Sequence, residues 1–388
     1  MGLRSAVGAA VALLVAAAGG GAAAPGPGVP GPGGSGAVAP GLAERVPTVF
    51  LGDESIGSYG IAPVEDGALL CVRARENLPD VIEDQLADQS ILLDITADVS
   101  CAGARLNHVW EEQDLGGGLA AVPQKRALTK ETRLVVVGLG AATAGVGQVL
   151  EQCSARLRGT EGALHPGAPV DASSPAGDCA AYFARGAGAA WLEARFTETG
   201  KDLDKLFSEI SSESPAADVV LVGYPRLVPE DRGRCREPKG ARLSKGRTRA
   251  GREVRAGEHD RPSTAAQSAR RRTEPQKVLT GAAGRPLADI PEAAWPLLDG
   301  LVQARLNTLM AAKAKQHKAR FVDLYAATGA STACDGTDRG TGGLLEPSQV
   351  TLHHQTFPWF LWANETGRDG NGDAVAQSIA AMYGRGPA

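Results

Sequence analysis

Aromatic residues are scarce in this sequence, at 4% of its 388 residues, whereas glycine alone contributes 50. This balance is typical of a chain from a high-GC genome, and the compositional bias explains it without a functional role. The net charge is also low, since 40 basic and 44 acidic residues give −4 at neutral pH. The overall charge therefore gives no reason to expect nucleic acid or an anionic membrane as a partner.

Long apolar runs are missing after the N-terminus. There, Arg4 precedes an apolar stretch at residues 6–18, and small residues follow at 21–24. This layout is typical of a secretory signal peptide, and the stretch is shorter than the roughly 20 residues of a spanning helix. We expect a signal peptide at residues 1–24, a flexible Pro/Gly-rich leader at 25–46, and a secreted protein without a membrane span.

No Cys-x-x-Cys pair occurs, which removes the usual signature of a zinc or thioredoxin-like site. The chain nevertheless has 6 cysteines: Cys71, Cys101, Cys153, Cys179, Cys235 and Cys334. In an exported protein an even number of cysteines predicts disulfides, although the spacing alone leaves the pairing open. We therefore expect three disulfides and no free thiol.

Short apolar runs rich in Val, Ile and Leu alternate with helix-compatible segments from residue 47 onward. The runs lie at residues 48–51, 90–95, 134–137, 218–222 and 320–324, and the helical segments at 78–88, 145–158, 191–211, 295–316 and 373–383. Strands buried on both faces and separated by helices predict a parallel sheet. We expect residues 47–388 to form a three-layer α/β/α sandwich with a five-stranded parallel sheet, whose ligand site lies beyond the carboxyl ends of the strands.

One segment, at about residues 232–277, departs from this pattern because it is polar, basic and without aromatic residues. Such a composition cannot bury enough apolar surface to offset the entropy of ordering, which predicts a solvated insertion. A basic arm that binds nucleic acid or anionic glycans is the alternative. Interspersed acids such as Glu253 and Asp260 argue against it, and we expect no nucleic-acid partner.

Four sequence blocks stand where the predicted strands end or the last helix begins. They read Gly52-Asp53-Glu54-Ser55, Asp98-Val99-Ser100-Cys101-Ala102-Gly103, Gly138-Leu139-Gly140-Ala141-Ala142 and Trp362-Ala363-Asn364-Glu365-Thr366-Gly367. Together these blocks resemble the signatures of the SGNH/GDSL ester hydrolases, above all the secreted actinobacterial esterases and lipases. The resemblance extends from about residue 47 to residue 383 and implies the flavodoxin-like sandwich of that family.

The resemblance also implies the role of each position, and most positions carry the wrong residue. Glu54 occupies the position of the family's nucleophilic serine and Trp362 that of its histidine. Ala142 occupies the position of the asparagine that donates to the oxyanion. A carboxylate opposes a developing oxyanion, an indole accepts no proton, and alanine has no donor. Gly103, which acts through its backbone N–H, is retained. The predicted protein is an ester hydrolase homologue that is impaired or inactive.

Two alternatives remain open at this site. Ser55, one residue after the expected nucleophile, is a tentative replacement that would make the chain a weak esterase, with His353 or His354 as its base. Otherwise the fold binds acyl or glycan ligands without catalysis. Trp359 stands where many relatives have the aspartate that orients the histidine, but some relatives dispense with that aspartate.

The remaining expectations concern disulfides, cofactors and partners. The resemblance implies that cysteines pair in sequence order, as Cys71–Cys101, Cys153–Cys179 and Cys235–Cys334. No spacing among acids such as Glu151, Asp335 and Asp338 matches a zinc or calcium site, so we expect neither metal nor other cofactor. The expected ligand is a small ester, lipid or glycan, and the expected state is a monomer.

Overall fold

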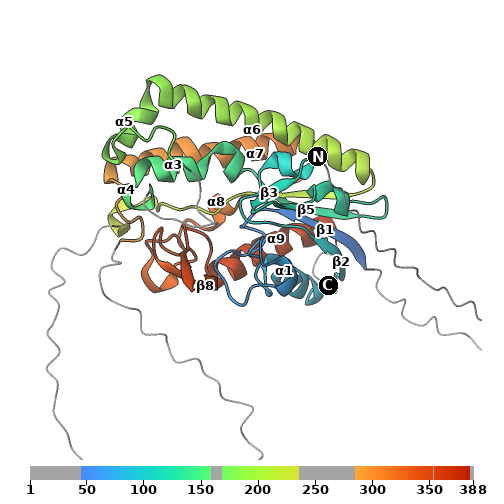
Figure 1. Cartoon of the computed structure of the whole chain (residues 1–388). Helices are drawn as coiled ribbons and strands as arrows, with labels where there is room; N and C mark the ends of the chain where they lie inside the picture. Colours follow the sequence, from blue (N-terminus) through green and yellow to red (C-terminus); the bar gives the residue numbers. More distant parts are fainter. Residues whose placement is uncertain (1–44, 159–167, 236–284, 353, 385–388) are drawn as a thin grey trace, which may run out of the picture. The chain divides into compact units, whose positions relative to one another are not determined.

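A computed structural model describes residues 45–158, 168–235, 285–352 and 354–384 of the chain. Its centre is a sheet of five strands, all parallel, in the order β2-β1-β5-β6-β7 (Figure 1). In this doubly wound order, β2 lies on one side of β1 and the later strands lie on the other. A crevice opens at the ends of β1 and β5, where the direction of strand addition reverses. The predicted five-stranded parallel sheet is confirmed.

The described elements follow one another along the chain as strands and helices of very different length. The strands are β1 (Val46–Gly52), β2 (Leu93–Asp98), β3 (Gln113–Gly116), β4 (Leu119–Ala121), β5 (Leu134–Gly138), β6 (Asp218–Val222), β7 (Arg320–Val322), β8 (Pro347–Leu352) and β9 (Gln355–Pro358). The helices are α1 (Leu78–Ala87), α2 (Ala141–Ala144), α3 (Val146–Cys153), α4 (Ala155–Arg158), α5 (Cys179–Ala184), α6 (Gly186–Glu213), a π-helix (Leu297–Ala304), α7 (Arg305–Gln316), α8 (Leu324–Ala327) and α9 (Glu365–Met382).

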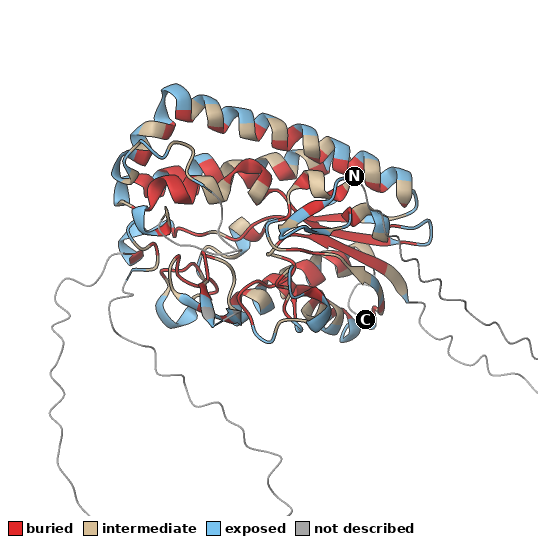
Figure 2. Ribbon diagram, in the orientation of Figure 1, coloured by how far each residue is buried: buried red, intermediate tan, exposed pale blue. Residues whose placement is uncertain are grey.

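Successive side chains of the central strand β5 enter two different cores, because neighbouring residues of a strand point to opposite faces. Leu134 and Val136 belong to the cluster that α1 and α9 cover, whereas Val135 and Val137 belong to the cluster under α3, α6 and α7. Figures 1 and 2 show these two layers of helices on either side of a buried sheet. Burial on both faces explains why these strands read as continuous apolar runs.

The expected helices form, with differences that tertiary contacts explain. Segment 145–158 is interrupted at Ser154, whose extended backbone separates α3 from α4. The Ser154 hydroxyl and the Arg156 N–H both donate to Asp289, 135 and 133 residues further on. Segment 295–316 starts as the π-helix and continues as α7. The last helix, α9, begins earlier than expected because the Asn364 side chain accepts from the Gly367 N–H and caps it.

Two β-hairpins, β3–β4 and β8–β9, were not expected from the sequence. Their strands are short and lack a strong apolar alternation, so the sequence pattern contains little to reveal them.

Three disulfides are present and pair in sequence order, as the resemblance implies: Cys71–Cys101, Cys153–Cys179 and Cys235–Cys334. Within the described ranges, no helix combines the length and the apolar character that crossing a bilayer requires. The predicted signal peptide, nearly all of the leader and most of the predicted insertion lie outside the described residues. Val46, the last residue assigned to the leader, is the first residue of β1.

Candidate functional site

A cavity of about 290 Å³ lies at the carboxyl edge of the sheet. Its wall comes from the segments that follow four parallel strands: Glu54 after β1, Gly103 after β2, Ala142 after β5 and Tyr224 after β6. The π-helix, α3, α7 and the segment before α9 also contribute to the lining. The cavity therefore lies where the strand pattern predicts a ligand site.

The end of β1 is fixed by contacts from outside the strand. The Gly52 N–H donates to the Gln124 side-chain oxygen at 3.0 Å, and the Gln124 amide donates back to the Gly52 carbonyl at 2.9 Å. The next N–H, that of Asp53, donates to the Gly138 carbonyl at the end of β5. These bonds set the height at which the turn of residues 53–55 leaves the sheet.

Asp53 is fully buried under this turn. One carboxylate oxygen accepts from the Ser55 N–H at 2.8 Å and from the Ser55 hydroxyl at 2.6 Å. The other accepts from the Tyr224 hydroxyl at 2.5 Å. Burial raises the pKa of Asp53 to about 6, against the opposing effect of these hydrogen bonds. Asp53 thus ties the first turn to the loop after β6.

The Tyr224 hydroxyl is shared between two partners. While it donates to Asp53, it accepts from the Ala141 N–H at 3.0 Å, at the start of α2. Burial and the neighbouring Asp53 raise the pKa of this phenol well above its usual range. A neutral tyrosine therefore connects the segments after β1, β5 and β6.

Glu54 is the acid that faces the cavity. One of its carboxylate oxygens accepts from the Gly103 N–H at 2.7 Å, so the side chain occupies the donor that the family resemblance assigns to an oxyanion. Gly103 has a φ of +75°, a conformation that glycine adopts without the strain of a side chain. Burial, and then the neighbouring charge of Asp53, raise the pKa of Glu54 to about 8.

This raised pKa predicts how stability depends on pH. A carboxyl that binds its proton more tightly in the folded state contributes less to stability once the pH passes its unfolded pKa. The loss continues until the folded pKa is reached. For Glu54 these limits are the ordinary value of 4.5 and about 8. We expect the free energy of unfolding of the wild type to fall from pH 5 to pH 8. At pH 8 the free energy of unfolding of Glu54→Gln should be about 1–3 kcal/mol higher than that of the wild type.

Chemical denaturation at pH 5, 6.5 and 8 measures this effect. The exposed Glu112 provides the matched control, because Glu112→Gln should leave the pH slope unchanged. A Glu54→Gln protein that keeps the full wild-type slope would contradict the raised pKa.

Ala142 and Trp362 line the same cavity as Glu54 and Gly103. The structure therefore brings together the four positions to which the resemblance assigns the nucleophile, the base and the oxyanion donors. The Trp362 ring centre lies 6.5 Å from that of Tyr224, at an interplanar angle of 54°. Trp359 instead packs in a small buried cluster with Ile61 and Ala74.

Ser55, the tentative replacement nucleophile, is not among the residues that line the cavity. Its hydroxyl donates to Asp53. His354 is exposed in the turn between β8 and β9, and His353 lies outside the described residues. His108 and His317 also contribute nothing to the cavity wall. Over the described ranges, no imidazole lines the cavity with Ser55 or Glu54.

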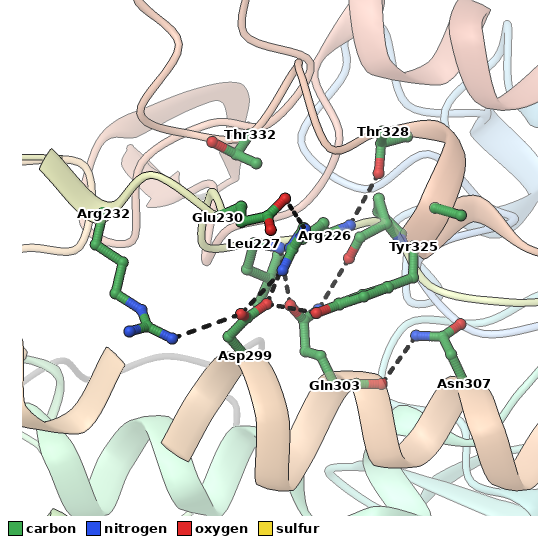
Figure 3. A network of polar contacts seen from close by, with 12 residues as sticks. Arg226, Leu227, Glu230, Arg232, Asp299, Gln303, Asn307, Tyr325, Thr328 and Thr332 are labelled. Carbon is green, nitrogen blue, oxygen red and sulfur yellow. Dashed lines mark hydrogen bonds and ion pairs between the residues drawn. The ribbon is translucent and has the colours of Figure 1, made fainter. Parts of the chain in front are cut away.

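Figure 3 shows a polar network centred on Asp299, two residues of which, Leu227 and Gln303, line the cavity. Asp299 in the π-helix accepts two hydrogen bonds from Arg226, each at 3.0 Å, and a third from the Tyr325 hydroxyl at 2.6 Å. One turn further along, Gln303 accepts from the Leu227 N–H and donates to the Pro225 carbonyl. We call these contacts the Asp299 network.

The sequence analysis missed this network and the role of Tyr224. The available signal was the spacing of Asp299, Gln303 and Asn307, which are polar residues at intervals of four in a largely apolar segment. Asn307 continues the row, since its side chain accepts from the Tyr224 N–H at 2.9 Å and donates to the Tyr224 carbonyl at 3.2 Å. Within the described part of the chain, no group of three acidic, histidine or cysteine side chains is arranged to hold a metal ion.

The structure is that of an α/β protein with a cavity at the carboxyl edge of a parallel sheet. No protein-family model matches the chain. A curated protein described as an esterase, from Streptomyces scabiei, is 41% identical over 362 residues, which cover 92% of this chain and 91% of the relative. The chain therefore belongs to the SGNH/GDSL esterase family.

Solved structures with a lower similarity include two other Streptomyces proteins. They are a phospholipase A1 from Streptomyces albidoflavus and an extracellular lipase from Streptomyces rimosus. Each is 17% identical, covers 87% of this chain and 99% of its own, and has a TM-score of 0.49.

Proposed function

We propose that this member of the ester hydrolase family binds a small organic ligand in the cavity and does not hydrolyse esters by the serine–histidine mechanism. The observation that carries the proposal is the bond between the Glu54 carboxylate and the Gly103 N–H. A carboxyl group in this place leaves no hydroxyl for acyl transfer and occupies a donor that an oxyanion would need.

The other cavity positions support the same proposal. An ester hydrolase of this class needs an imidazole to take the proton of its nucleophile and return it to the leaving group. Trp362 presents an indole, whose single N–H donates and does not accept. Ala142 adds no side-chain donor, and the loss of one such donor typically lowers the rate by about 10²–10³.

The cavity itself suits ligand binding. It is enclosed by apolar side chains, among them Val146, Leu150 and Leu306, with a few polar groups on its wall. Small-molecule sites have this composition, an apolar lining with a small number of oriented polar groups. We therefore expect an acyl or similar small organic ligand rather than a polymer that requires a long open groove.

A chromogenic short-chain ester assay on the purified chain tests the proposal against the weak-esterase alternative. We expect no turnover above that of Ser55→Ala, because the Ser55 hydroxyl donates to Asp53 and does not line the cavity. Robust turnover that disappears in Ser55→Ala would overturn the proposal. Binding is measured in parallel by tryptophan fluorescence, with Trp362→Phe to identify the signal from the cavity wall.

We also propose that the chain is exported and loses residues 1–24. The three disulfides support this, since such bonds persist mainly in oxidising compartments. N-terminal sequencing of protein recovered from the culture medium tests it, and an uncut N-terminus in protein retained by the cell would contradict it.

A further inference from the structure

Four aromatic side chains meet at the cavity: Tyr59, Tyr224, Phe360 and Trp362. The whole chain has only five tryptophans, five tyrosines and seven phenylalanines in 388 residues. They form two pairs, Tyr59 with Phe360 at 6.2 Å between ring centres and Tyr224 with Trp362 at 6.5 Å. These four aromatic rings therefore share the cavity wall with Glu54.

The backbone beside these rings is unusual. Phe360 and Leu361, both in the cavity wall, have φ values of +50° and +67°. Side chains other than glycine rarely adopt this conformation, which costs about 1–3 kcal/mol per residue and occurs mainly at functional sites. The strain is a second sign that the position of these side chains in the wall serves a ligand.

One polar group at the cavity, the Tyr59 hydroxyl, has no partner among the described residues, and another, the Glu54 carboxyl, has a single one. The Tyr59 hydroxyl belongs to a residue only 3% exposed, yet no described group forms a hydrogen bond with it. Glu54 accepts one hydrogen bond, from Gly103, and no described lysine or arginine lies within ion-pair distance of its carboxylate. When it is ionised, the half-buried Glu54 carboxylate can therefore be stabilised by a cationic ligand.

We propose that the cavity binds an organic ammonium ion, an inference that rests on the proposed function of the cavity as a ligand site. The positive nitrogen lies against the Glu54 carboxylate inside the aromatic side chains, and the apolar part of the ligand extends along Val146, Leu150 and Leu306. The faces of aromatic rings attract cations by about 0.5–2 kcal/mol each, and aromatic cages are a common device for quaternary ammonium groups. The unpartnered Tyr59 hydroxyl is available for a polar atom next to the nitrogen.

One cation of the protein, Arg105, also lines the cavity. No ion pair within 4.0 Å joins Arg105 to Glu54 in the described part of the chain. Arg105 therefore does not occupy the proposed ammonium position. The groups that face Glu54 electrostatically are Asp53, Tyr59 and Tyr224, none of which is cationic.

Isothermal titration of the full chain with two matched probes tests the proposal. Choline carries a quaternary ammonium group, and 3,3-dimethyl-1-butanol has a carbon in place of the charged nitrogen. We expect choline to bind at least about tenfold more tightly than the alcohol at pH 9. Between pH 9 and pH 6 choline affinity should fall by most of this preference, because protonation of Glu54 removes the charge that attracts it. The affinity of the alcohol should change little.

Glu54→Gln should lose most of the preference for choline and all of its pH dependence, and the aromatic rings should account for the preference that remains. Glu112→Gln, on the exposed surface, is the control that should change neither. Equal binding of the two probes would overturn the ammonium proposal and leave the cavity a ligand site. Hydrolysis that Ser55→Ala abolishes would instead overturn the proposed function. A folded protein that binds neither probe up to millimolar concentration would contradict the ammonium inference.

Discussion

The triple substitution Glu54→Ser, Ala142→Asn and Trp362→His is expected to raise the hydrolysis of a chromogenic short-chain ester at least about 10³-fold over the unchanged chain. All three positions line one cavity with Gly103. The first change provides a hydroxyl nucleophile and frees the Gly103 N–H, which now donates to Glu54. The others add a side-chain donor for the oxyanion and an imidazole base.

The expected size follows from general magnitudes. A positioned general base contributes about 10²–10⁴ in rate, and one oxyanion donor contributes about 10²–10³. The expected rate increase is smaller than the product of the two factors, because no neighbouring side chains orient the new residues. In particular, Trp359 and not an acid stands three residues before position 362.

The control is the same variant with Glu54→Ala in place of Glu54→Ser, which keeps the added base and donor but has no nucleophile. A further Ser55→Ala change in the active triple variant should leave its rate nearly unaltered. A triple variant that is folded by circular dichroism but no faster than the Glu54→Ala control would contradict the assignment of these positions.

The second large effect is expected at the Asp299 network: Asp299→Ala should lower the free energy of unfolding by about 3–5 kcal/mol. The Asp299 and Arg226 side chains are only 8% and 17% exposed, so water replaces little of the lost interaction. The substitution leaves the Arg226 guanidinium and the Tyr325 hydroxyl without the carboxylate they now share. Breaking one side of a buried pair is costly because the other charge stays buried.

Guanidinium denaturation measures the loss, with Asp338→Ala on the exposed surface as the control. The double variant Arg226→Leu/Asp299→Leu should lose clearly less than the sum of its single variants, since it removes both charges together. A loss below about 1 kcal/mol in Asp299→Ala would show that the network does not stabilise the fold.

The network also affects the cavity. Gln303 and Asn307, further along the same helical segment, hold the backbone of Leu227 and Tyr224. Because the Tyr224 hydroxyl donates to Asp53 next to Glu54, a loosened π-helix should weaken ligand binding together with stability. The Asp338→Ala control should leave ligand binding intact.

The edge of the sheet at which the site lies could be predicted because the strands of a parallel sheet can be recognised in the sequence. Strands buried on both faces must be apolar throughout, so runs such as 134–137 and 218–222 are visible without alignment. The residues that follow such strands then belong to the ligand edge. The resemblance to the SGNH/GDSL signatures, and not the strand pattern, then assigned Glu54, Gly103, Ala142 and Trp362 to one site. The replacement of a hydroxyl by a carboxyl at position 54 is likewise a property of the sequence alone.

Only the tertiary structure decided which side chains face one another. Asp53 meets Tyr224 across 171 positions of chain, and Arg226 meets Asp299 across 73. Sequence periodicity reveals neither contact, because each contact depends on the position at which a loop leaves the sheet. The same dependence directs the Ser55 hydroxyl toward Asp53 and places four aromatic rings in the cavity wall. Composition and pattern fixed where the site lies, whereas long-range packing fixed what each of its groups touches.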